Sequence, residues 1–203
     1  LKKFSTFTAQ ILQNNLSFMK KIFTSLFVLS IFAFNVNAQD IAEPDFIGEV
    51  VLVKSDNSAI PLEKQLSTNR GVASTGLILT GIGKVRSQLQ IDGCCAKIQV
   101  SSNEDLSFII KGIDNKTDPM SIVKIFKFEE KKKYRRAEVA SVSSFGSAKS
   151  NNLDYVSFTG KKYGESSYLL KVSALQPGQY GITISNPNAV DEKQTVISTF
   201  AVK

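Results

Sequence analysis

Short runs in which apolar and polar residues alternate follow one another from Asp40 to the C-terminus. The clearest run is 84–92 (KVRSQLQID), where Val85, Leu89 and Ile91 fall on one face and mainly charged or amide residues on the other. A period of two is typical of a β-strand with one face in the core, and no run after Asp40 repeats with a convincing helical period. The pattern therefore predicts an all-β fold.

Turn residues divide the chain into about ten expected strands. Residues 106–113 (LSFIIKGI) form an apolar run that is expected to be central in a sheet. Pro61 places its own strand at an edge, because proline cannot donate a hydrogen bond to a ladder. The expected strands cover residues 46–54, 59–65, 84–92, 95–101, 106–113, 121–128, 134–142, 154–159, 167–174, 179–185 and 195–202.

The segment 71–83 (GVASTGLILTGIG) is open to two interpretations. Its run LIL would suit a buried strand, while its four glycines favour bends or a close approach of the backbone. The pair Gly83 and Lys84 does not complete a phosphate-binding loop, because that motif needs glycine at position 78 and a hydroxyl residue at 85. Residues 66–71 (LSTNRG) are expected to form a loop.

A fully charged tip, EEKKK at 129–133, is expected to join the arms of a hairpin. Alternation places Tyr134 and Arg136 on the face opposite Arg135. The basic side chains would suit contact with anionic lipid headgroups, phosphates or acidic glycans. The alternative is a solvated tip, in which two glutamates offset part of the charge and the lysines discourage edge pairing. The candidate binding residues are Lys127, Lys131, Lys132, Lys133, Tyr134, Arg135 and Arg136.

The segment Leu175–Tyr180 (LQPGQY) resembles the tyrosine corner of immunoglobulin-like and fibronectin-type domains. In that motif a turn feeds a strand whose tyrosine hydroxyl bonds back to the backbone of the corner. The resemblance implies a β-sandwich, and no interior linker or internal repeat divides the chain. We therefore expect a single antiparallel β-sandwich of the immunoglobulin-like kind. The tyrosine-corner resemblance indicates the fold and says nothing about the function.

A secretory signal peptide is the clearest functional sequence in the chain. Two lysines follow Met19, a 13-residue apolar run covers 22–34, and VNA at 36–38 supplies small or short residues at the cleavage site. The run falls short of the roughly 20 apolar residues that a membrane span needs. Residues 1–18 are therefore interpreted as lying upstream of the true start or as a long n-region, 19–38 as the signal peptide, and 39–203 as the exported β-sandwich domain.

Export places the protein in the periplasm, at the cell surface or in the medium, without a transmembrane span after cleavage. The formal net charge of +7 includes four lysines in residues 1–38, so the exported chain keeps 21 Lys and Arg against 18 Asp and Glu. So small an excess does not point to nucleic acid as a partner. The absence of His excludes imidazole bases, His-dependent nucleophilic sites and His-ligated zinc.

Cys94 and Cys95 are the two cysteines of the chain, and they are adjacent. Neighbouring Cα atoms are about 3.8 Å apart, below the range of about 4.4–6.8 Å that disulfides usually span. One interpretation is a buried thiol beside a partly exposed one. A disulfide, either between the neighbours or between molecules, is the second. A redox or metal role is the third, although no CxxC spacing supports it.

Several segments resemble a group of exported bacterial proteins that have no established activity. They are IPLEKQ at 60–65, AKIQV at 96–100, KIFKFEEKKKYR at 124–135 and LQPGQYGI at 175–182. The resemblance therefore implies no catalytic residue. The last 50 residues also resemble the C-terminal sorting domains of secreted bacterial proteins, through the Gly-x-Tyr strand at 178–180 and the final Lys203.

The function expected from these observations is a non-enzymatic binding or structural role at the cell envelope. The partner would be an envelope component or a protein, with anionic lipid or glycan among the candidates, and no catalytic residue, cofactor or metal is assigned. The alternatives are a carboxylate-based hydrolase of envelope polysaccharide and a sorting or assembly module. Asp40, Glu43 and Asp45 cluster near the expected new N-terminus, but a glycosidase pair is defined by its separation in space.

Overall fold

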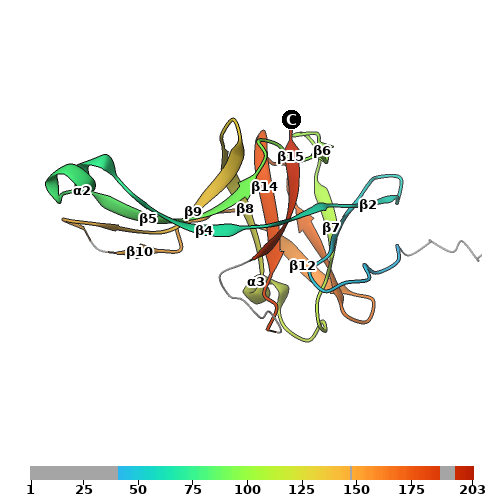
Figure 1. Ribbon diagram of the computed structural model, residues 1–203. Helices are drawn as coiled ribbons and strands as arrows, with labels where there is room; N and C mark the ends of the chain where they lie inside the picture. Colours follow the sequence, from blue (N-terminus) through green and yellow to red (C-terminus); the bar gives the residue numbers. More distant parts are fainter. Residues whose placement is uncertain (1–40, 147, 188–194) are drawn as a thin grey trace, which may run out of the picture. The chain divides into compact units, whose positions relative to one another are not determined.

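Two sheets of mainly antiparallel strands make up the computed structural model, which describes residues 41–146, 148–187 and 195–203 (Figure 1). The segments interpreted as upstream sequence and signal peptide lie outside the described residues. The all-β sandwich expected from the alternating pattern is confirmed. Within the described ranges, no helix is both long enough and apolar enough to cross a membrane.

The smaller sheet contains five strands in the order β12–β13–β7–β1–β2. Its central strand, β7, is the apolar run expected there, and Pro61 ends the edge strand β2, so both placements are confirmed. The strands are β1 (Val50–Val53), β2 (Ala59–Pro61), β7 (Leu106–Lys111), β12 (Thr159–Tyr163) and β13 (Ser167–Val172).

The larger sheet contains ten strands, seven of them in the order β3–β15–β14–β8–β9–β5–β4. Strand β11 pairs with β8, β10 with β9, and β6 runs parallel to β15. The strands are β3 (Glu63–Leu66), β4 (Thr68–Ala73), β5 (Lys84–Asp92), β6 (Gln99–Val100), β8 (Val123–Glu130), β9 (Tyr134–Ser143), β10 (Lys149–Ser150), β11 (Asp154–Tyr155), β14 (Gly178–Ile184) and β15 (Val196–Val202).

The main core joins the two sheets through apolar side chains of both. Phe108 of β7 lies 5.1 Å from Phe200 of β15 between ring centroids, and Tyr180 of β14 stacks on Phe200 at 5.3 Å. The Tyr180 hydroxyl donates to the Gln176 carbonyl at 2.6 Å, which confirms the tyrosine-corner geometry. The final two long strands therefore belong to the core of the sandwich.

The larger sheet divides at the hairpin between β8 and β9. These strands pair only at Glu129–Arg136 and Glu130–Arg135; beyond that, β8 continues beside β14 and β11, and β9 beside β5 and β10. A second apolar cluster fills the base of this fork: Leu89, Ile91, Phe126, Phe128, Ala137 and Ile197. We call β4, β5, β9, β10 and helix α2 (Thr75–Thr80) the arm; in Figure 1 it extends from the fork and carries α2 at its far end.

The arm contains most of the differences from the sequence-based expectation. Residues 66–71, expected as a loop, contribute the end of β3 and much of β4. The ambiguous segment 71–83 contains α2, which begins after Ser74 and ends before Gly81, whose φ of 73° lies in the left-handed region that glycine tolerates. Because α2 buries no residue and β4 is exposed throughout, the sequence of neither element shows the amphipathic pattern from which a helix or strand is predicted.

Fifteen strands lie in the described residues, more than the approximately ten expected. Some of the difference comes from expected strands that are split. Residues 154–159, expected as one strand, supply β11 to the larger sheet and only the first residue of β12 in the smaller one. The short helix α3 (Pro119–Ile122) begins at the last residue of the turn cluster at 114–119 and replaces the first two residues of the strand expected at 121–128.

Candidate functional site

Arg135 does not belong to an exposed basic patch, which corrects the expectation for this residue. Its side chain is fully buried, with Nε donating to the Gly93 carbonyl at 3.1 Å and Nη2 to Gln65 Oε1 at 3.2 Å. The guanidinium lies 6.0 Å from the centre of the Phe128 ring. Burial lowers the pKa of Arg135. The predicted alternation is confirmed, since Arg135 faces inward while its two neighbours are partly exposed. The charged group of Arg135 therefore contacts partners inside the fold and not a ligand at the surface.

Other basic residues of the predicted patch are already held by the protein. Arg136 Nε pairs with a Glu129 oxygen at 2.6 Å, and Lys131 forms an ion pair with the same carboxylate. Lys127 Nζ donates to the Pro177 carbonyl at 3.0 Å. These contacts spread the charges over the hairpin and the tyrosine corner, so they do not present one continuous cationic surface.

Lys132, Lys133 and Tyr134 remain at the tip of the hairpin. Both lysines are exposed, and no ion pair involves them among the residues that the structure describes. Tyr134 is partly exposed at the first position of β9. The structure thus leaves a much smaller basic surface than the seven residues proposed from sequence.

A groove in the fork brings six charged side chains together. Its cavity volume is about 290 Å³. Three cations and three carboxylates contribute to its wall, so the groove has no formal charge excess. The lining residues are Arg86, Gln88, Lys127, Phe128, Glu129, Arg136, Ala137, Glu138, Asn152 and Asp154.

The electrostatics of the fork groove do not suit acid catalysis. The hydrogen bond from Arg136, followed by that from Lys131, lowers the pKa of Glu129 to about 2. Burial opposes ionisation of Glu138, but hydrogen bonds from Lys84 and other donors leave its pKa lowered. A glycosidase of the usual two-carboxylate kind needs an acid whose pKa is raised, and neither glutamate offers one.

The arm ends in a group of exposed apolar side chains. Phe145, Leu79 and Ile78 keep 84%, 77% and 71% of their surface exposed. We call residues 72–85 and 142–146 the arm tip. Its exposed apolar residues, which come from both sides of the arm, are Val72, Ile78, Leu79, Ile82, Val85, Val142 and Phe145.

Hydroxyl side chains satisfy the backbone of the arm tip. Ser74 Oγ accepts from the backbone N–H groups of Leu77, at 3.4 Å, and Lys84, at 2.9 Å. Ser144 Oγ lies 3.0 Å from the Gly83 nitrogen, from which it accepts, and within hydrogen-bond distance of the Gly81 and Gly83 carbonyls. Because these bonds close the two loops on each other, the tip has a defined backbone despite having little apolar core.

The charges around the arm tip are of one sign. Residues 68–87 and 139–150 contain Arg70, Lys84, Arg86 and Lys149 but no Asp or Glu. Glu138, at the inner boundary, pairs with Lys84 at 3.1 Å and Arg86 at 3.3 Å. Even when Glu138 is included, cations outnumber carboxylates by three. Sequence reasoning missed this site because the segment was divided between an ambiguous strand and two loops, although its lack of acidic residues was visible.

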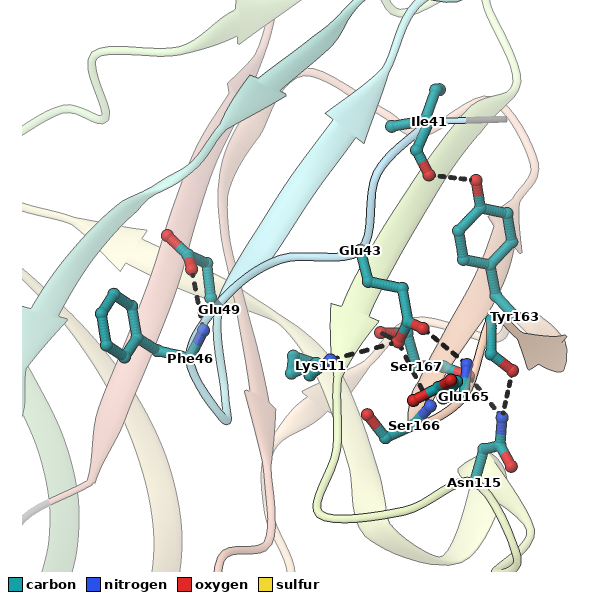
Figure 2. Close-up of polar contacts among 11 residues, drawn as sticks. Ile41, Glu43, Phe46, Glu49, Lys111, Asn115, Tyr163, Glu165, Ser166 and Ser167 are labelled. Carbon is teal, nitrogen blue, oxygen red and sulfur yellow. Dashed lines mark hydrogen bonds and ion pairs between the residues drawn. The ribbon is translucent and has the colours of Figure 1, made fainter. Parts of the chain in front are cut away.

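Polar contacts of Glu43 attach the first described residues to the smaller sheet. The Glu43 carboxylate accepts from Lys111 Nζ at 3.3 Å and from the Ser166 backbone at 3.2 Å. It also accepts from Glu165 N and Ser167 Oγ, and Figure 2 shows these donors around it. The Ser167 hydroxyl, then the Glu165 amide and weaker donors, lower the pKa of Glu43 to about 2. With its oxygens occupied by protein donors, this carboxylate serves as a clamp.

The adjacent cysteines form a disulfide with each other, so of the three interpretations the pair of free thiols is wrong. Across the described ranges, no group of three or more His, Cys, Asp or Glu residues is placed to hold a metal ion. No family model, curated protein or solved structure matches the chain. The resemblances to exported bacterial proteins and to sorting domains therefore stay predictions.

Proposed function

We propose that this chain is a non-enzymatic β-sandwich protein, exported to the cell envelope, that binds an envelope component through its arm. The observation that carries the proposal is the arm tip, where apolar side chains are exposed together around a hydrogen-bonded backbone. Grouped apolar exposure of this kind is typical of an interaction surface, whereas single exposed apolar residues need no explanation.

The fork supports this proposal because it gives the arm a fixed base. Leu89 and Ile91 of β5 pack with Phe126 and Phe128 of β8, and the buried Arg135 links the hairpin to Gly93. An arm anchored in this way loses little conformational freedom on binding, so more of its contact energy contributes to affinity.

The alternatives receive less support. The lowered pKa values of Glu129 and Glu138 argue against a carboxylate-based hydrolase in the fork groove. A separable C-terminal sorting module is disfavoured because Tyr180 and Phe200 are part of the main core. Export itself rests on the signal peptide in the sequence.

The test compares two polar variants of the exported chain, residues 39–203, for binding to envelope fragments from the source cells. Leu79→Ser combined with Phe145→Ser changes the arm tip, and Phe46→Ser changes an apolar residue that is 68% exposed outside the arm. We expect the tip variant to remain in the supernatant after sedimentation, while the Phe46→Ser control sediments like the unaltered protein. Equal sedimentation of all three proteins would refute binding through the arm.

A further inference from the structure

We infer that the arm tip inserts into the surface of a lipid bilayer that carries anionic headgroups. The inference rests on the proposed function and names the partner of the same site. Three properties of the tip support it: its apolar side chains lie at the far end of an extension, its backbone is closed by hydrogen bonds, and its flanking charges are cationic.

The position of the apolar residues suits a fluid partner. In Figure 1, α2 lies at the far end of the arm, and the exposed Ile78 and Leu79 belong to that helix. Phe145 comes from the loop after β9, which the Ser144 hydroxyl joins to the loop after α2. A projecting apolar end needs a matching pocket on a protein, whereas lipid chains rearrange around it, as they do around the apolar face of an interfacial helix.

The hydrogen bonding of the tip suits a site with little water. Backbone N–H and C=O groups that enter a bilayer must find partners within the protein. Ser74 Oγ accepts from the N–H groups of Leu77 and Lys84, and Thr80 Oγ1 donates to the Gly76 carbonyl at 2.8 Å. These hydroxyls prepare the tip for a shallow position among the headgroups.

The charge pattern selects anionic lipid. Arg70 and Lys149 flank the apolar residues and form no ion pair with the described residues, Lys84 and Arg86 share the carboxylate of Glu138, and the two tip segments contain no carboxylate. Juxtamembrane cations of this kind are attracted by anionic headgroups within about a Debye length, and long basic side chains can bury their stems while the charge stays in water. The same cations oppose tip-to-tip association of two copies, so a second copy is the weaker choice of occupant.

The chain has no Trp, which permits a direct measurement of insertion. Phe145→Trp places a single indole at the arm tip, and Phe46→Trp places one at an exposed apolar position outside the arm. Both variants, made in the exported chain of residues 39–203, are mixed with vesicles of phosphatidylcholine alone, or with roughly one third phosphatidylglycerol. Equal urea unfolding midpoints for the variants and the unaltered protein establish that both are folded.

We expect the emission of Phe145→Trp to shift to the blue with the anionic vesicles and to be quenched by brominated acyl chains. The emission of Phe46→Trp should change in neither respect. Adding Arg70→Gln and Lys149→Gln should weaken binding to anionic vesicles by at least about tenfold and reduce its sensitivity to salt. An unchanged Phe145→Trp spectrum, or equal changes at both positions, would overturn the inference.

A comparison with envelope fragments separates this inference from the proposed function. If Phe145→Trp responds to envelope fragments but not to protein-free anionic vesicles, the bilayer is not the partner and binding through the arm stands. If it responds to neither, and the Leu79→Ser and Phe145→Ser variant sediments normally, both proposals fail. A response to neutral and anionic vesicles alike would refute the charge selection.

Discussion

Replacing Glu43 with Gln should detach the first described residues from the smaller sheet. The carboxylate accepts hydrogen bonds from the Ser167 hydroxyl and from the Glu165 and Ser166 backbone, and it pairs with Lys111 (Figure 2). Glutamine keeps the size of the side chain but removes its charge. Since the donors are arranged around a negative group, the neutral amide cannot replace it in full.

The contribution of Glu43 to the free energy of unfolding follows from its pKa, which falls from 4.5 to about 2 in the folded protein. This difference sets an upper limit of about 3 kcal/mol on the stability that Glu43 adds at neutral pH, because solvent screens the contacts of a carboxylate near the surface. The contribution is complete above the unfolded pKa of 4.5, because the carboxyl is then ionised in both states. It is lost as the pH falls towards about 2, where folded protein also binds the proton.

Urea unfolding of the full chain at neutral pH and near pH 2 measures this effect. At neutral pH we expect Glu43→Gln to lower the free energy of unfolding by about 1–2 kcal/mol, and near pH 2 we expect the two proteins to converge. Hydrogen exchange at the Glu165 and Ser166 amides should accelerate, since both donate to this carboxylate. That local measurement detects detachment even where the rest of the sandwich stays folded.

Variants of two residues that donate hydrogen bonds to Glu43 test whether these contacts explain the loss of stability. Ser167→Ala removes the largest contribution to the lowered pKa of Glu43, and Lys111→Met removes the smallest of those identified. We therefore expect Ser167→Ala to cost more stability than Lys111→Met. A Glu43→Gln loss that is equally large near pH 2 would contradict the electrostatic explanation, as would a larger loss in Lys111→Met than in Ser167→Ala.

Three further predictions concern the core. Tyr180→Phe removes the bond to Gln176 and should lower the free energy of unfolding in urea by about 1 kcal/mol. Gly181→Ala places a Cβ 2.7 Å from the Phe128 ring, so we expect a loss of about 1–3 kcal/mol in the same assay. Arg135→Met should lower the thermal midpoint, because it removes the hydrogen bonds that the buried guanidinium donates to Gly93 and Gln65; an unchanged midpoint would contradict the role of Arg135 inside the fork.

Sequence patterns predicted the strands that have one buried face. Strand β5 begins and ends where the alternation in KVRSQLQID begins and ends. Leu89 and Ile91 are buried as expected, whereas Val85 on the same face is exposed and Gln88 on the opposite face is buried. The arm was less predictable because its outer part has no core beneath it. All six residues of β4 are exposed, so burial imposes no period of two on that strand.

The candidate sites depend on contacts that local patterns do not contain. Glu43 and Ser167 form a hydrogen bond although they are 124 positions apart in the sequence, and no local sequence pattern predicts this contact. Alternation placed Arg135 correctly on the face opposite Arg136 but did not reveal that this face is the buried one. The usual exposure of arginine suggested the reverse, and only the position of the fork decides between the two faces.

Along strands β5 and β9, apolar side chains are buried near the fork and exposed at the arm tip. Near the fork, β5 buries Ile91, whereas beyond the register shift at Ser87 and Gln88 it exposes Val85. If the outer part served only to extend the sheet, polar residues would serve at least as well, because an exposed apolar side chain adds little to stability and promotes association. Its apolar residues therefore need an explanation outside the folding of the chain, and contact with a lipid surface supplies one.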